Sequence, residues 1–249
     1  MIRYSFKIFC VAFSACFCCA GSLLAEDNNP HTDKMMNEKL NLTQEWDKVF
    51  PKSDKVTHRK VSFRNRYGIM LAADLYMPRN VNGKLPAIAV SGPFGAVKEQ
   101  SAGLYAQTMA ERGFLTIAFD PSYTGESGGF PRYVASPDIN TEDFCAAVDY
   151  LSTRDDVDSE RIGIIGICGW GGMAVNAAAI DTRIKATVTS TMYDMSRVNA
   201  NGYFDAMDAD ARYELRKQLN AQRTADAKSG SYALAGGVPD PLPADAPGF

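Results

Sequence analysis

The chain has 249 residues, of which 46% are hydrophobic and 22% are charged, and its formal net charge is −3. This composition is typical of a globular protein with one large domain or two small ones, and it excludes collagen-like and wholly disordered chains. The small negative charge provides no basic field that would attract nucleic acid.

The first 25 residues have the pattern of a secretory signal peptide. Arg3 and Lys7 form a short basic start, residues 8–20 are apolar, and small residues follow. The apolar stretch is too short, and too rich in Cys and Gly, for a membrane span. We therefore expect residues 1–25 to direct export to the periplasm.

Residues 13–16, Phe-Ser-Ala-Cys, resemble a lipoprotein box. A soluble exported protein and a membrane-anchored lipoprotein with lipid on Cys16 are both open at this stage. Four of the six cysteines lie in the leader, so a mature chain would keep only Cys145 and Cys168. A single pair of cysteines is no disulfide framework.

Residues 26–55 form a polar lead-in, and strand and helix patterns alternate over residues 56–194. Strands are predicted at 56–65, 69–77, 85–91, 114–119, 162–167 and 184–192. Helices are predicted around 104–112 with a C-cap at Gly113, around 144–151 with an N-cap at Asn140, and over 170–180. This alternation is typical of an α/β protein with a mostly parallel sheet and helices on both faces.

The pattern changes after Asp194. Residues 195–230 are polar and helical, with a thin apolar stripe that includes Leu215 and Leu219. The segment fits a lid over the sheet, or a solvated helix with one buried edge. Residues 231–249 are rich in Pro and Gly and read as a linker, so we expect the sheet to lack its last strands.

Two stretches resemble a nucleophile elbow, the sharp turn that exposes a nucleophile between a strand and a helix. The first contains Ser127 within Gly-Glu-Ser-Gly-Gly, but Ser127 lies seven residues beyond Asp120, and Pro131 and Pro137 follow instead of a helix. The second contains Cys168, which follows a predicted strand directly and precedes a predicted helix. Cys168 is therefore the candidate nucleophile.

The surroundings of Cys168 suit acyl chemistry. A helix amino terminus stabilises a thiolate, and the N–H of Gly169 can point at a developing oxyanion. A second donor is expected from the loop after residues 85–91, where Pro93 has no N–H and Phe94 is the first donor. The alternative for Cys168 is a small buried residue in a helix–sheet contact.

The strand–Gly-x-Cys–helix unit, the loop GPFGAVKEQ and the loop DPSYTGESGG together resemble the α/β-hydrolase superfamily. The likeness is greatest to its dienelactone-hydrolase-like and X-prolyl-peptidase-like bacterial members. It covers about residues 56–230 and implies Cys168 as nucleophile, Phe94 and Gly169 as oxyanion donors, and a small-molecule acyl substrate. Trp170 departs from the superfamily pattern, which has a small residue two places after the nucleophile.

The superfamily takes its catalytic His from beyond the last strand, whereas the two histidines of this chain are His31 and His58. Asp194, just after the 184–192 strand, is the candidate catalytic acid, and its alternative role is a helix cap. An incomplete triad predicts weak or no turnover. A non-catalytic binding protein and a nonfunctional, truncated gene product are the alternatives. We find no motif for a metal or another cofactor.

Overall fold

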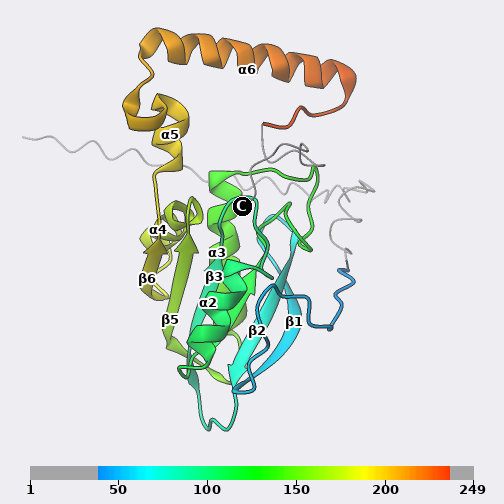
Figure 1. The fold of residues 1–249 in the computed structure, drawn as a ribbon, viewed down its shortest axis with the longest axis vertical. Coiled ribbons are helices and arrows are strands. Elements are labelled where there is room, and N and C mark those ends of the chain that lie inside the picture. The colour runs from blue at the N-terminus through cyan, green and yellow to red at the C-terminus, as the bar shows by residue number, and fades with distance from the viewer. Residues whose placement is uncertain (1–38, 236–249) are drawn as a thin grey trace, which may run out of the picture.

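The structure of the protein is a computed structural model that describes residues 39–235 (Figure 1). The predicted signal peptide at residues 1–25, the anchor at Cys16 and most of the predicted linker lie outside the described residues. Within residues 39–235, no helix combines the length and the apolar character needed to cross a membrane.

A six-stranded sheet forms the centre of the described chain, in the order β1-β2-β4-β3-β5-β6. Its strands are β1 (Val56–Arg64), β2 (Met70–Pro78), β3 (Leu85–Ser91), β4 (Leu115–Phe119), β5 (Val157–Ile167) and β6 (Ile184–Ser190). The strands β4, β3, β5 and β6 are parallel, and the β1–β2 hairpin joins them antiparallel to β4. The prediction of a mostly parallel sheet is confirmed.

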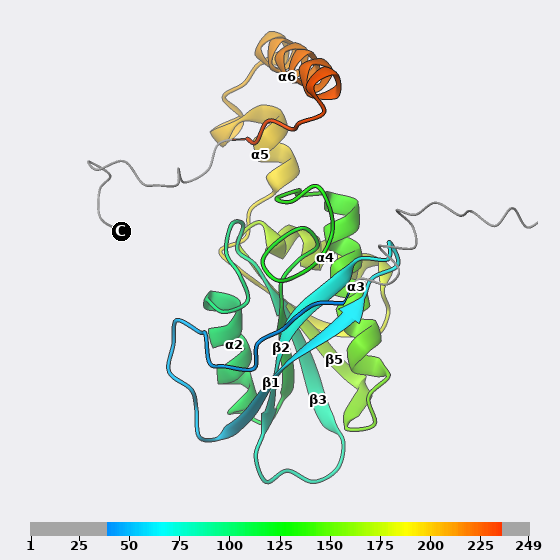
Figure 2. The ribbon, with the colours of Figure 1, turned by 90° about the vertical axis from the view of Figure 1, so that its right-hand side faces the viewer.

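Helices cover both faces of this sheet (Figure 2). Helix α2 (Ser101–Ala110) packs on β3 and β4, while α3 (Pro137–Ser152) and α4 (Trp170–Ile180) pack on β5 from the other face. Two apolar clusters result, one on each side of the sheet. The runs over β3 and β4 are mostly apolar because both of their faces are buried.

Helix α3 begins earlier than the sequence pattern predicts. Ser136, not Asn140, is its N-cap, and the Ser136 side chain accepts from the N–H of Ile139. Pro137 takes the first helical position, where its missing N–H costs nothing. Asn140 lies in the first turn and is buried, and its amide donates to Asp143 at 3.0 Å. The cap prediction at Asn140 is therefore wrong.

Beyond β6 the chain forms α5 (Met195–Asn201), a short 3₁₀ turn (Tyr203–Asp205) and α6 (Ala209–Ser229). Figure 1 shows α5 and α6 beyond the carboxyl ends of the parallel strands, with α6 lying across that end of the molecule. No residue of α6 is buried, and Leu219 in its apolar stripe is 59% exposed. Within the described residues, α6 therefore lacks the buried edge that one of the two sequence interpretations gave it.

Candidate active site

A sharp turn joins β5 to α4, and Cys168 stands at its apex. Cys168 has φ of 60°, in the left-handed region, which costs a residue with a Cβ roughly 1–2 kcal/mol. The turn is held by two hydrogen bonds: the Cys168 N–H donates to the carbonyl of Ser190 at 2.9 Å, and the Cys168 carbonyl accepts from Gly171 at 3.0 Å. Cys168 is partly exposed. This strained strand-to-helix turn has the geometry of a nucleophile elbow.

Close packing around the elbow requires glycine at Gly166. A Cβ there would lie closer than 3.0 Å to the carbonyl oxygen of Trp170 and to Ala174, so α4 can approach β5 only because Gly166 has no side chain. The bulky Trp170 is accommodated in the same region. Its ring is almost fully buried and stacks on Phe94 with a centroid distance of 5.4 Å.

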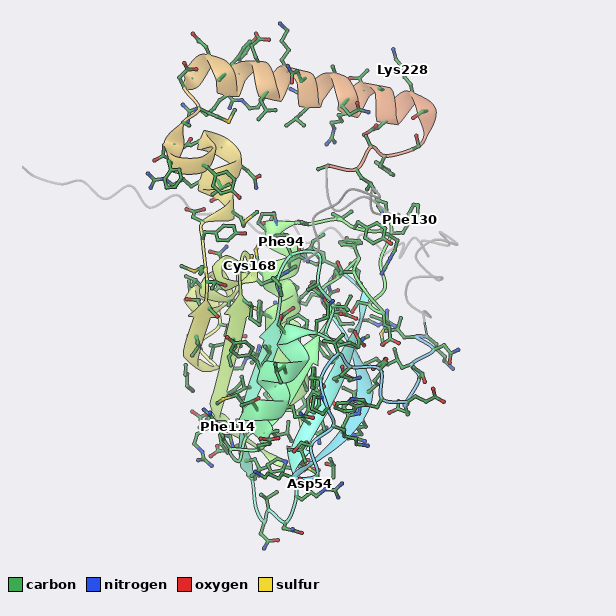
Figure 3. All side chains as sticks on the ribbon, viewed as in Figure 1. Asp54, Phe94, Phe114, Phe130, Cys168 and Lys228 are labelled. Carbon is green, nitrogen blue, oxygen red and sulfur yellow. The ribbon has the colours of Figure 1, made fainter. Side chains whose placement is uncertain are left out.

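Phe94 and Gly169, the two expected oxyanion donors, lie next to each other. A Cβ on Gly169 would collide with the Phe94 ring, and both residues line one cavity. Figure 3 places Phe94 beside Cys168 at the end of the sheet that faces α5. Within the described chain, no hydrogen bond uses the backbone N–H of Phe94 or of Gly169. Both donors therefore remain available to a ligand, and their catalytic role stays a prediction.

Tyr193 is a site residue that the sequence reasoning missed. Its hydroxyl lies 3.1 Å from the Sγ of Cys168. The hydrogen bond with Cys168, and then the charge of that thiol group when ionised, raise the pKa of Tyr193 above its ordinary value. Tyr193 therefore keeps its proton and can donate it in a hydrogen bond to a thiolate. One signal pointed to it: Tyr193 directly precedes Asp194 in the loop after a parallel strand, where ligand sites form in α/β sheets.

Asp194 caps helix α5. Its Oδ1 accepts from the hydroxyl of Ser196 at 2.5 Å and from the N–H of Arg197 at 2.9 Å. These two hydrogen bonds lower the pKa of Asp194 below its ordinary value. Asp194 also lines the cavity beside Gly169. The geometry thus shows the capping role, whereas the role of catalytic acid stays a prediction.

Ser127 is buried, and its hydroxyl both donates and accepts a hydrogen bond. Its hydroxyl donates to the carbonyl of Asp120 at 2.7 Å and accepts from the N–H of Ala72 at 2.8 Å. Ser127 therefore fastens the loop after β4 to strand β2 and does not stand at an elbow.

His58 lies on β1, and β2, β4 and β3 separate this strand from β5 and the elbow. Its imidazole is 3% exposed, and Nε2 lies 2.7 Å from Oδ1 of Asp74. Asp74 also binds the ammonium of the buried Lys48 at 2.8 Å. His58 therefore belongs to a buried ionic cluster rather than to the elbow.

A second part of that cluster gathers three carboxylates, of Glu99, Asp120 and Glu126, whose oxygens lie within 4.8 Å of one another. This arrangement resembles a metal site, but the Nζ of Lys98 contacts all three, at 2.6, 2.8 and 2.5 Å. Burial would lower the pKa of Lys98, but Asp120 and the other carboxylates outweigh it and raise the pKa. The ammonium therefore takes the place that a metal cation would need.

Two cavities flank Phe94. One has a volume of about 410 Å³ and is bounded by α4, the start of α5 and the Tyr193 loop. The other has a volume of about 390 Å³ and lies between the Phe94 loop and a segment that contains Arg132. Cys168 lines neither cavity directly, but its neighbour Gly169 and its hydrogen-bond partner Tyr193 line the first. The thiol thus stands at the edge of a ligand-sized hollow.

The sequence and structure of this chain are similar to those of known proteins. The chain is 68% identical over 198 residues to the uncharacterized protein PA2218 of Pseudomonas aeruginosa, covering 79% of this chain and 53% of that protein. The crystal structure of PA2218 superposes with a TM-score of 0.77 at 65% sequence identity, covering 82% of this chain and 66% of that one.

Two further relatives are more distant. The uncharacterized protein YcjY of Escherichia coli is 44% identical over 182 residues, 71% of this chain and 59% of its own. The thiohydrolase aneE of Aspergillus aculeatus is 32% identical over 137 residues, 55% of this chain and 42% of its own. The chain thus spans about half the length of the curated relatives it matches.

The family model of the X-Pro dipeptidyl-peptidases (S15 family) matches residues 67–235. This match covers the sheet from the β1–β2 turn onward, the elbow at Cys168 and both helices beyond β6. The chain therefore belongs to the X-Pro dipeptidyl-peptidase (S15) family, within the α/β-hydrolase superfamily.

Proposed function

We propose that the protein is an acyl hydrolase that uses Cys168 as its nucleophile on a thioester, ester or amide carbonyl. The observation that carries the proposal is the left-handed backbone of Cys168, with φ of 60°, between a central parallel strand and a helix. Strain of this kind persists only where the surrounding structure enforces it, and it is concentrated at functional sites.

The residues around the thiol support a defined sequence of steps. The Cys168 proton leaves to solvent, and the thiolate is stabilised by the start of α4 and by the Tyr193 hydroxyl at 3.1 Å. Sγ then bonds to the carbonyl carbon, and the oxygen accepts hydrogen bonds from the N–H groups of Phe94 and Gly169. As the intermediate collapses, the bond to the leaving group breaks and that group departs with the electron pair, an amine leaving group taking up a proton from solvent as it leaves. An acyl-enzyme on Cys168 remains.

We propose that this chain hydrolyses its acyl-enzyme slowly. Water needs a general base to attack a thioester quickly, and such assistance contributes ~10²–10⁴-fold. The imidazole of His58 is buried against Asp74 on a distant strand. Among the described residues this imidazole does not reach Cys168, and His31 lies outside them, so we expect acylation to outpace release.

Two further parts of the proposal come from likeness and sequence pattern. Thioesters are the favoured substrates because a relative at 32% identity is named a thiohydrolase. Export follows from the signal pattern of residues 1–25, with lipid on Cys16 as the anchored form of the same proposal.

The test is to treat the protein with 4-nitrophenyl acetate and an acetyl thioester, and to locate the acetyl group by peptide mass spectrometry. We expect a single burst of leaving group, acetyl on Cys168, and then slow turnover. Cys145 is an internal control, because burial raises the pKa of its thiol to about 11. A burst that survives in Cys168→Ala, or acetyl placed equally on Cys145, would overturn the proposal.

The contribution of Tyr193 is measured with Tyr193→Phe. A hydrogen bond to a charged group contributes ~1.5 kcal/mol or more, so we expect the burst to slow about tenfold. Tyr105→Phe is the matched control, because the Tyr105 hydroxyl bonds to Ser190 at 3.1 Å and not to the thiol. Equal slowing in the two variants would remove Tyr193 from the mechanism.

A further inference from the structure

We propose that the 410 Å³ cavity beside Cys168 is an acyl pocket for uncharged, apolar acyl groups, and that Gly172 sets the length of chain it accepts. This inference rests on the proposed acyl chemistry of Cys168 and names the class of substrate that the site takes. The cavity has the size of a small-molecule site.

The position of the cavity suits an acyl group. Its wall includes both expected oxyanion donors, Phe94 and Gly169, and also Tyr193, whose hydroxyl contacts the thiol. A carbonyl held by the two N–H groups and attacked by Sγ would therefore have its substituents at the mouth of this cavity.

The wall of the cavity is mostly apolar. Its larger apolar side chains are those of Phe94, Met173, Val175, Met192 and Met195, and Ala135 and Pro137 also line it. Three of them are methionines, whose unbranched side chains adapt to ligands of different shape. The lining residues of the described chain include one charged group, Asp194. An acyl chain that ends in a carboxylate would therefore meet a negative charge and no compensating cation.

The second cavity differs from the first in the charge of its wall. It lies on the other side of Phe94, has a volume of about 390 Å³ and includes the cationic Arg132. Hydrogen bonds to the carbonyls of Gly125 and Ser127 hold that guanidinium in place. An anionic leaving group suits the side that holds Arg132, so the cavity without a cation in its wall is left for the acyl group.

Gly172 is a lining residue beside which the cavity has space for a side chain. It lies on α4 among the lining residues, and a Cβ built there finds its nearest neighbour, the carbonyl oxygen of Tyr193, only at 4.0 Å. At Gly169, in contrast, a Cβ would collide with Phe94. A larger side chain at Gly172 would therefore project into open cavity and shorten it.

The first arm of the test measures the rate of Cys168 acylation by 4-nitrophenyl esters of acetate, butyrate, hexanoate and the anionic hemiglutarate. In the unmodified protein we expect the rate to rise by up to fourfold per added methylene group, the factor that corresponds to burying one CH₂. The hemiglutarate should react more slowly than the hexanoate.

Gly172→Leu should lose the gain with chain length, so that hexanoate acylates Cys168 no faster than acetate does in the same variant. Ala179→Leu is the matched control, because it adds the same group to an exposed position of α4 outside the cavity. An unchanged chain-length series in Gly172→Leu, or hemiglutarate reacting as fast as hexanoate, would overturn the inference.

The second arm avoids thiol chemistry. Binding of acetamide and hexanamide to Cys168→Ala is measured by calorimetry, with Gly172→Leu added in the same background. We expect hexanamide to bind more tightly than acetamide and Gly172→Leu to abolish the difference. Hexanamide binding without any acylation of Cys168 would overturn the proposed function but support the pocket. Acylation with no chain-length effect and no hexanamide binding would overturn the pocket alone.

Discussion

Replacing Gly166 by Ala tests whether the elbow depends on the close approach of α4 to β5. The added Cβ would lie closer than 3.0 Å to the Trp170 carbonyl oxygen and to Ala174, and backbone and helix atoms cannot move aside as a flexible side chain can. Overpacking of this kind costs ~1–3 kcal/mol. The backbone of Gly166 is not left-handed, so collision is the sole penalty.

Gly172→Ala is the matched comparison on the same helix. Its Cβ meets nothing closer than 4.0 Å, and Ala is favoured over Gly within a helix by about 0.8–1 kcal/mol. The two variants should therefore change stability in opposite directions and differ by about 2–4 kcal/mol. For a chain of this size, that corresponds to a difference in Tm of roughly 4–16 °C.

The assay is urea and thermal unfolding followed by circular dichroism, together with the rate of Cys168 alkylation by iodoacetamide. We expect Gly166→Ala to unfold at lower urea concentration and to alkylate at a different rate, because the turn must shift. Gly166→Ala as stable as the unmodified protein would refute the reasoning. It would mean that α4 does not approach β5 this closely. The left-handed backbone of Cys168, which depends on that approach, would then be refuted as well.

Two further predictions concern strain and pH. At an ordinary position a protein with Gly is less stable than the same protein with Ala by roughly 0.5–1 kcal/mol. The left-handed backbone of Cys168 penalises a Cβ, so the Cys168→Gly variant should be at least as stable as Cys168→Ala. Unfolding of Cys168→Ala at a higher urea concentration than Cys168→Gly would contradict this prediction. Burial tends to raise the pKa of Asp47, but hydrogen bonds from Lys48 and Lys60 outweigh it and lower the pKa to about 2. The stability contributed by Asp47 is thus present above the ordinary pKa of 3.8 and is lost as the pH falls toward 2. In urea titrations, the free energy of unfolding of Asp47→Asn should therefore fall less steeply with decreasing pH than that of the unmodified protein. An equal dependence on pH in the two proteins would count against this prediction.

Much of this fold could be predicted from the sequence because its signals are local. Apolar runs such as 85–91 and 162–167 mark strands buried on both faces, and residues 162–180 mark strand, turn and helix in order. The elbow at Cys168 was found this way, since the test for it uses only the neighbouring residues. The cap of α3 was missed although it too is local, because Pro137 was not recognised as the first residue of a helix.

Contacts between distant residues were decided by the tertiary structure alone. Tyr193 meets Cys168 because β5 and β6 are parallel neighbours, so the loops that follow them leave the same edge of the sheet. Lys48, Lys60 and Lys98 have fully buried side chains, which no local pattern predicts for lysine. Their burial is tolerated because carboxylates from separate strands and loops converge on them, and a sequence pattern does not encode that convergence.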